Sequence, residues 1–325
     1  MTEPLLRIRD LHVTFPTETG RVQAVRGVDV DVFAGELVGI VGESGSGKSV
    51  TFLAAMGLLP KTAIVTGSVK IGADEMLGKD ARQMRAVRGK RIAMIFQDPL
   101  SALNPTHRVG RQISEMILAH NDIPREDAQD RALELLDMVG IPQPARRARQ
   151  YPHEFSGGMR QRVMIAMAVA NDPDVLIADE PTTALDVTVQ AQILEVIQNV
   201  QGALGAAVVF ITHDLGVIAR VAQRVQVMYA GRTAERGIVD DILLHPTHPY
   251  TQGLINSIPS LGNQRLTPIP GAPPNMLRPP SGCAFRVRCP HAMPVCAEGL
   301  PDLHQFGTVE TACVRAEELV GIGTP

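Results

Sequence analysis

Apolar and polar residues alternate near the start of the chain, as they do in half-buried β-strands. The alternation runs through residues 5–15 and again through residues 22–32. Residues 37–41 are apolar at nearly every position, which predicts a strand buried on both faces of a mostly parallel sheet. A helix is predicted from about Lys48 to Leu59, because Pro60 follows and ends it.

The rest of the pattern changes from strand to helix and back. Residues 61–97 are predicted to form further strands, and residues 98–172 a helical insertion. Later strands are expected at 175–179, 208–212 and 225–229, with a helix at about 188–201. This alternation predicts a doubly wound α/β core made of residues 1–97 and 173–244.

The composition changes after residue 244. Residues 268–301 hold nine of the 24 prolines, a density that argues against regular helices or central strands. Residues 245–325 are therefore predicted to form a small, loop-rich appendage.

Bulk properties limit the possible partners. The chain has 325 residues, 45% of them hydrophobic and 20% charged, with a formal net charge of −3. These values fit a soluble globular protein and give no reason to expect a nucleic-acid partner. The longest apolar runs are about half a membrane span, and the charged N-terminus lacks a signal-peptide core. We therefore expect a cytoplasmic protein that reaches a membrane only by docking to other subunits.

The clearest chemical motif is a phosphate-binding loop. Residues 42–49 read GESGSGKS, with a predicted strand before them and a helix after them. Glycines let the backbone approach phosphate closely, and the loop amides and helix N-terminus present positive dipoles to it. Lys48 is expected to reach the β- and γ-phosphates and Ser49 to bind Mg²⁺; the alternative is a glycine turn that only caps a helix. The residues expected to contact ATP and Mg²⁺ here are Gly42, Ser44, Gly45, Ser46, Gly47, Lys48, Ser49 and Val50.

Other candidate residues follow predicted strands. Asp179 is expected to hold Mg²⁺ through water, and Glu180 to act as general base on the attacking water, although a carboxylate pair after a strand is often only a surface feature. Gln97 is placed to touch Mg²⁺ and the water, and His213 to contact the γ-phosphate. Phe15 is either an adenine-stacking residue or a core residue.

A second glycine turn, Phe155–Met159, completes an ordered set of motifs. Together with the phosphate loop, Gln97, Asp179-Glu180, Ala184-Leu-Asp186 and His213, it resembles the ATP-binding subunits of ABC transporters. The resemblance implies an ABC-type α/β fold with a mixed sheet and a helical subdomain. It also implies a head-to-tail dimer, in which the phosphate loop of one subunit faces the second glycine turn of the other across ATP.

The resemblance also assigns residues to the opposite face of ATP. Those residues are Ser156, Gly157, Gly158, Met159 and Asp186. Ser156 offers a hydroxyl and an N-cap, and the two glycines allow a close backbone approach. Two departures from the family pattern are Phe155 in place of Leu and Met159 in place of Gln. Neither supplies the main phosphate contacts, so activity is expected to persist.

The C-terminal sequence narrows the subfamily. His248-Pro-Tyr-Thr251, Gly271-Ala-Pro-Pro and the stretch from Gly282 to Pro290 resemble the ATPases of dipeptide and oligopeptide importers, as does Leu103-Asn-Pro105. This implies two membrane-spanning permease subunits, an extracytoplasmic peptide-binding protein and a second ATPase subunit, which is a copy or a related chain. The expected location is the cytoplasmic face of the cell membrane.

Three alternatives remain open. Some relatives carry nickel or glutathione. A soluble ABC-type ATPase could remodel nucleic acid or ribosomes, although such proteins usually carry two cassettes or a long coiled coil, and this chain has one cassette and no sustained heptads. A regulatory iron–sulfur module could use the cassette only to dimerise.

All four cysteines lie in the appendage, at Cys283, Cys289, Cys296 and Cys313. In a reducing cytosol such a group is better interpreted as metal ligands than as disulfides. Their spacing matches neither common zinc ribbons nor bacterial ferredoxins, and four thiolates suit zinc or a 4Fe–4S cluster. The family resemblance favours 4Fe–4S with zinc as the alternative, and a site without metal stays open. Bound metal is expected to stabilise the appendage.

Overall fold

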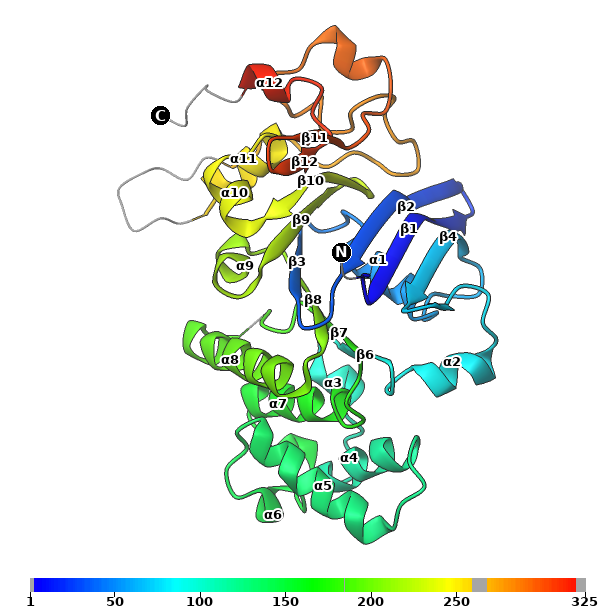
Figure 1. Ribbon diagram of the computed structural model, residues 1–325, viewed down its shortest axis with the longest axis vertical. Coiled ribbons are helices and arrows are strands. Elements are labelled where there is room, and N and C mark those ends of the chain that lie inside the picture. Colours follow the sequence, from blue (N-terminus) through cyan, green and yellow to red (C-terminus); the bar gives the residue numbers. More distant parts are fainter. Residues whose placement is uncertain (1–2, 184, 259–267, 320–325) are drawn as a thin grey trace.

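The computed structural model describes residues 3–183, 185–258 and 268–319. They form two sheets, and the smaller one lies to one side of the main sheet in Figure 1. The main sheet has the strand order β11-β12-β10-β9-β3-β8-β7-β6. Strands β9, β3, β8, β7 and β6 are parallel to one another, and β10, β12 and β11 join antiparallel. The bounds are β3 Leu37–Val41, β6 Ile92–Ile95, β7 Val175–Asp179, β8 Ala207–Thr212, β9 Arg224–Tyr229, β10 Arg232–Ile238, β11 His304–Phe306 and β12 Val309–Thr311.

The smaller sheet is antiparallel and has the order β2-β1-β4-β5. Its strands are β1 Leu6–Thr17, β2 Gly20–Val32, β4 Ile64–Ile71 and β5 Asp74–Glu75. Helix α1 (Lys48–Ala55) contacts both β1 and β2, so it lies against this sheet.

Five helices, α3 to α7, gather at one end of the molecule (Figure 1). They are α3 Pro99–Ala102, α4 Val109–Leu118, α5 Arg125–Met138, α6 Pro144–Arg147 and α7 Gly157–Ala168. The remaining helices are α2 Ala81–Val87, α8 Val187–Leu204, α9 Leu215–Val221, α10 Val239–Leu244, α11 Pro249–Asn256 and α12 Ala316–Leu319. The C-terminal segment with α12, β11 and β12 lies at the opposite end from α3 to α7. No helix in the described part of the chain is both long enough and apolar enough to cross a membrane.

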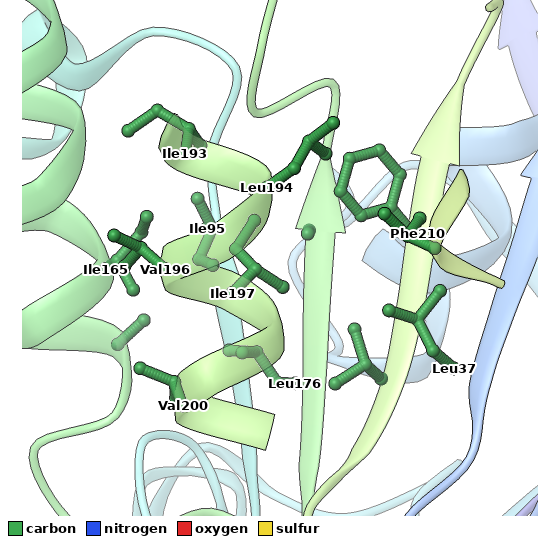
Figure 2. Packing of buried hydrophobic residues seen from close by; sticks show 14 of the residues in the cluster. Leu37, Ile95, Ile165, Leu176, Ile193, Leu194, Val196, Ile197, Val200 and Phe210 are labelled. Carbon is green, nitrogen blue, oxygen red and sulfur yellow. The ribbon is translucent and has the colours of Figure 1, made fainter. Parts of the chain in front are cut away.

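Strands β3, β6, β7 and β8 are apolar at nearly every position because both of their faces are covered. In β7 and β8, Leu176, Ala178, Val208 and Phe210 belong to one buried cluster, whereas Val175, Ile177, Val209 and Ile211 belong to another. The first cluster includes α8, whose Ile193, Ile197 and Val200 are drawn beside the sheet in Figure 2. The second cluster packs against α1 and the small sheet. The two layers hold the parallel strands from both sides.

The predicted α/β core with a mixed sheet is confirmed, with three differences in detail. The segment 61–97, predicted as strands, contains α2, because Asp80 and Gln83 form a capping box at its start. Helix α1 ends at Ala55 rather than near Leu59. The appendage is not only loops: Thr311 of β12 pairs with Glu235 of β10, so this segment extends the main sheet. The proposed domain boundaries stay a prediction.

Truncating Phe210 tests the role of the layer between α8 and the sheet. Phe210 is completely buried, so we expect Phe210→Ala to lower the free energy of unfolding by about 3–5 kcal/mol. Urea unfolding followed by circular dichroism measures the change. Val187→Ala on α8 is the control, since Val187 is 80% exposed and its loss should cost within about 0.5 kcal/mol. A loss below about 1 kcal/mol in Phe210→Ala would contradict this packing.

Candidate functional site

Four parallel strands deliver the candidate residues to one edge of the main sheet. The segments that follow β3, β6, β7 and β8 all leave at the carboxyl ends of these strands, where ligands bind in open α/β sheets. A cleft of about 640 Å³ opens there. It is lined by residues 42–50 together with Gln97, Glu180, His213 and Leu254.

Two glycines of the phosphate loop (residues 42–49) have no room for a side chain. Gly42 has a φ of +152°, and a Cβ there would lie 2.2 Å from the carbonyl oxygen of Met228. Gly47 has a φ of +98°, and its Cβ would lie 2.6 Å from the carbonyl oxygen of Ala24. The loop therefore packs with its backbone directly against neighbouring backbone, and only glycine permits this.

Lys48 is held inside the phosphate loop. It is 5% exposed, and its Nζ donates hydrogen bonds to the carbonyl oxygens of Gly42 (2.7 Å) and Glu43 (3.0 Å). Burial lowers the pKa of Lys48, and the carboxylates of Glu180, Asp179 and Glu43 oppose that shift. An ammonium placed in this way is ready to bind an anion in the cleft.

Ser49 and Asp179 meet across 130 residues of sequence. The Ser49 hydroxyl donates to Oδ1 of Asp179 at 2.7 Å. Burial raises the pKa of Asp179, while the hydrogen bond from Ser49 and the charge of Lys48 lower it. A hydroxyl beside a carboxylate offers the oxygen ligands that Mg²⁺ prefers.

Three side chains surround one oxygen of Glu180. Its Oε2 accepts a hydrogen bond from the Thr183 hydroxyl at 2.8 Å and from the Gln97 amide at 3.4 Å, and Nδ1 of His213 lies 3.5 Å away. Glu180 also has a φ of +47°, a strained conformation for a residue with a side chain. The carboxylate is thus fixed at the cleft by neighbours from three strand ends. Sequence reasoning missed Thr183, although a hydroxyl in the turn after the Glu-Pro pair was a usable signal.

The signature turn (Phe155–Met159) lies elsewhere in the chain. The Ser156 side chain accepts from the Met159 amide at 3.4 Å and so caps α7. Ser156 and Gly157 are exposed, and neither lines the cleft. Gly158 has a packing role as well, because a Cβ there would lie 2.5 Å from Val189 of α8. Ser156 and Gly157 are therefore accessible for contact with another molecule.

Two of the remaining predicted positions do not join the cleft. Asp186 caps α8 by accepting from the Val189 amide at 3.0 Å. Phe15 lies half-buried on β1, packed against the core beneath the small sheet, and does not line the cleft. The structure does not bring Phe15 into the cleft, because its β1 position turns it toward that core. Ala184 lies outside the described residues.

Three residues near the cleft were missed as site residues. Leu254 of α11 lines it. Tyr250, also on α11, accepts a hydrogen bond from the Glu43 amide at 2.8 Å. Arg288 of the C-terminal segment pairs with the Glu43 carboxylate at 2.6 Å. Tyr250 is part of the stretch that had marked only the subfamily, and nothing local in the sequence pointed to Arg288.

The four cysteines lie around one cavity. Cys283, Cys289, Cys296 and Cys313 line it together, and all four are free thiols. Burial raises the pKa of Cys283 and of Cys289, and raises that of Cys313 to about 11. Among residues 3–183, 185–258 and 268–319, no group of three or more His, Cys, Asp or Glu side chains is arranged to hold a single metal ion. A metal at these cysteines stays a prediction.

The close packing of the phosphate loop can be tested with matched glycine variants. Gly42→Ala would place a methyl group against the Met228 carbonyl, so we expect ATP affinity to fall at least about tenfold. Gly35→Ala is the control, because Gly35 also has a positive φ (+69°) but has nothing within 4 Å of its Cβ position. The measurement is titration with a fluorescent ATP analogue. Equal ATP affinity in the two variants would mean that the phosphate loop tolerates a methyl group at residue 42.

Two family models match the chain. The model described as ABC transporter matches residues 25–183, and the model described as oligopeptide/dipeptide transporter, C-terminal region, matches residues 234–296. The first range contains the phosphate loop, the signature turn and Glu180. The second contains Tyr250, Arg288 and three of the four cysteines.

Several curated proteins are similar over nearly their whole length. The dipeptide transport ATP-binding protein DppD of Bacillus subtilis is 52% identical over 303 residues, which cover 92% of this chain and 90% of that protein. The oligopeptide transport ATP-binding protein OppD of the same organism is 53% identical over 320 residues, covering 96% and 88%. OppD of Salmonella typhimurium is 48% identical over 321 residues, covering 97% and 95%.

Solved structures agree in fold. The dimeric structure of MJ0796, a bacterial ABC transporter cassette, is 28% identical with a TM-score of 0.64, and the match covers 72% of this chain and 98% of that one. The same cassette in a dimeric post-hydrolysis state with ADP and Pi gives the same values.

Proposed function

The chain belongs to the ABC transporter family of ATP-binding subunits, and from that premise we propose that it hydrolyses ATP to drive the import of dipeptides and oligopeptides. The observation that carries the proposal is the convergence of Lys48, Ser49 and Glu180 on one cleft, with Asp179 hydrogen-bonded to Ser49 behind it. The match of residues 234–296 to a peptide-transporter region supports peptides over nickel or glutathione as the cargo. Relatives named for dipeptide and oligopeptide transport support the same choice.

Each residue of the cleft has a distinct role in this proposal. The loop amides and Lys48 bind the β- and γ-phosphates, and Ser49 and Asp179 hold Mg²⁺. Glu180 accepts the proton of the attacking water, while Gln97 and His213 position the water and the γ-phosphate. The bonds from Thr183 and Gln97 keep the Glu180 carboxylate pointed at the cleft.

A second ATPase subunit supplies the other side of the nucleotide. Ser156 and Gly157 are exposed, and they are absent from the cleft of their own chain. In a head-to-tail dimer the N-terminus of α7 would face the γ-phosphate bound by the partner. The dimeric structure of the MJ0796 cassette, which is 28% identical to this chain, supports the presence of a second ATPase subunit.

The assembly also contains two membrane-spanning permease subunits and an extracytoplasmic peptide-binding protein. The ATPase docks to the permeases at the cytoplasmic face of the membrane, where the helices α3 to α7 and the segment after Gln97 transmit movement. Dimer closure on ATP and reopening after hydrolysis drive the transport cycle.

A substitution at Glu180 should separate ATP binding from ATP hydrolysis. We expect Glu180→Gln to bind ATP and to hydrolyse it about 10²–10⁴-fold more slowly, because Gln cannot accept the proton. Lys48→Ala is the companion variant and should lose about ten- to a hundredfold in ATP affinity. Phosphate release by the assembled transporter and titration with an ATP analogue measure the two effects. Normal turnover in Glu180→Gln would remove Glu180 as the base.

The four cysteines are proposed to hold a 4Fe–4S cluster. Four free thiols line one cavity, and these thiols would be the ligands of such a cluster. Zinc is the alternative, because four thiolates also suit a single tetrahedral zinc ion. The raised pKa values mean that a metal must displace thiol protons when it binds. The cluster would stabilise a segment that has little apolar core of its own.

Metal analysis tests the cluster directly. Protein purified without oxygen should carry about four irons per chain and a yellow-brown colour. Cys313→Ser should lower the iron content and the temperature of unfolding of the C-terminal segment. Stoichiometric zinc in a colourless protein would replace the iron–sulfur assignment.

A further inference from the structure

Glu43 places a negative charge inside the loop that binds phosphate. The other residues between Gly42 and Lys48 are glycines and serines, which add no charge. The Glu43 side chain is 27% exposed, so water screens it only in part. A carboxylate here should repel the triphosphate, because Glu43 lines the same cleft and is only partly screened by water.

Arg288 covers this carboxylate from the C-terminal segment. Its Nη1 donates to one Glu43 oxygen at 2.6 Å and its Nη2 to the other at 2.9 Å, which is the bidentate geometry of strong arginine–carboxylate pairs. The Arg288 side chain is only 3% exposed. The hydrogen bonds that Arg288 donates to Glu43 raise the pKa of Arg288. A guanidinium is in any case charged at every working pH.

Every donor of Arg288 has an acceptor. Besides the two bonds to Glu43, Nε donates to the Pro270 carbonyl at 2.8 Å, Nη1 to the Tyr229 hydroxyl at 3.3 Å and Nη2 to the Ile269 carbonyl at 3.4 Å. A guanidinium has five N–H groups, and all five are used here. The guanidinium is therefore fixed in position, and it ties residues 269–270 and β9 to the phosphate loop.

The backbone of Glu43 is held from the same side. Its amide donates to the hydroxyl of Tyr250, a fully buried residue. The Tyr250 ring packs against Tyr229 and Phe285 at centroid distances of 4.5 and 5.4 Å. Side chain and backbone of Glu43 are both anchored to the C-terminal part of the chain.

We propose that Arg288 is a positioning residue for ATP binding, which cancels the charge of Glu43 and so sets the affinity of the phosphate loop for the triphosphate. The inference rests on the proposed function, since it assigns a further residue to the same nucleotide site. Arg288 itself does not line the cleft, so it acts through Glu43.

Three variants of the full chain separate charge from structure. Arg288→Met leaves Glu43 uncompensated, and we expect the Kd for Mg-ATP to rise about tenfold, the effect of two unit charges roughly 10 Å apart at an effective dielectric near 20. Glu43→Gln removes the repelling charge and should bind ATP at least as tightly as the wild type. The double variant Glu43→Gln/Arg288→Met should return to within about threefold of the wild type. In the assembled transporter, Arg288→Met should raise KM for ATP by a similar factor and leave kcat nearly unchanged.

Arg236→Met is the matched control. Arg236 also forms a bidentate pair, with Glu310 at 2.7 and 3.1 Å, and that pair also links β10 to the C-terminal segment. It has no contact with the phosphate loop, so its loss should leave the Kd for Mg-ATP within about twofold of the wild type.

The Kd values of these variants either support or overturn the proposed role of Arg288. Weak binding by Arg288→Met that the double variant rescues supports the inference. If the single and double variants bind Mg-ATP equally weakly, Arg288 has a purely structural role and the inference is overturned. Unchanged affinity for Mg-ATP in Arg288→Met would also overturn the inference. Should Arg288→Met fail to fold, Glu43→Gln decides alone: a loss of affinity beyond about threefold overturns the inference, and retained or tighter binding supports it.

The same titrations distinguish this inference from the proposed function. If the wild type binds ATP and Lys48→Ala binds it at least about tenfold more weakly, the nucleotide site stands whatever Arg288 does. If the wild type does not bind ATP, both proposals fall.

Discussion

The common edge at which four parallel strands end is the constraint on which the nucleotide site depends. The register aligns Val41 of β3 with Thr212 of β8, and Asp179 of β7 with Ile211 of β8. Residues that follow these strands must therefore emerge side by side, which brings Ser49 to Asp179 and His213 to Glu180. Parallel strands can lie together only when both faces of the sheet are covered. The α8 layer and the small sheet with α1 provide that cover, so the chemistry at the edge rests on two apolar interfaces below it.

A single chain presents two separate halves of the proposed site. The phosphate loop lines the cleft, whereas Ser156 caps α7 on an exposed surface of the same molecule. The need for glycine differs between the two residues after Ser156. Gly158 packs against Val189, and a Cβ there would collide with it; a Cβ on Gly157 would meet only Leu185, at 3.9 Å. Gly157 thus has no packing reason to be glycine within its own chain. A close approach by another molecule, as in the proposed head-to-tail dimer, would account for a bare backbone at that exposed position.

The sequence predicted the parts of the site that depend on local order. The structure of a glycine loop between a strand and a helix is determined by residues close to it in sequence. The same holds for a carboxylate pair after an apolar run. The strands of the core were located well for the same reason. Helix α2 was missed because its start depends on the capping box of Asp80 and Gln83 within a segment interpreted as strand. The pairing of β12 with β10 and the bond between Arg288 and Glu43 join residues 76 and 245 positions apart, and no periodicity reports such contacts. Phe15 had two interpretations, and its adenine-stacking role stays a prediction, since the side chain is half-buried on β1 and does not line the cleft.

The ion pair between Arg288 and Glu43 connects the C-terminal segment directly to the phosphate loop of the ATPase. This segment is part of the ATPase core, because its strands β12 and β11 extend the main sheet and its Arg288 reaches the phosphate loop. Arg288 lies next to Cys289 in sequence, and Phe285 lines the cavity of the cysteines while packing on Tyr250. A short path of packed residues therefore joins the two sites. Binding linkage is reciprocal: if order in this segment favours ATP, bound ATP must favour order in the segment by the same free energy. ATP binding and the order of the C-terminal segment are then coupled through one shared element, the turn that contains Glu43.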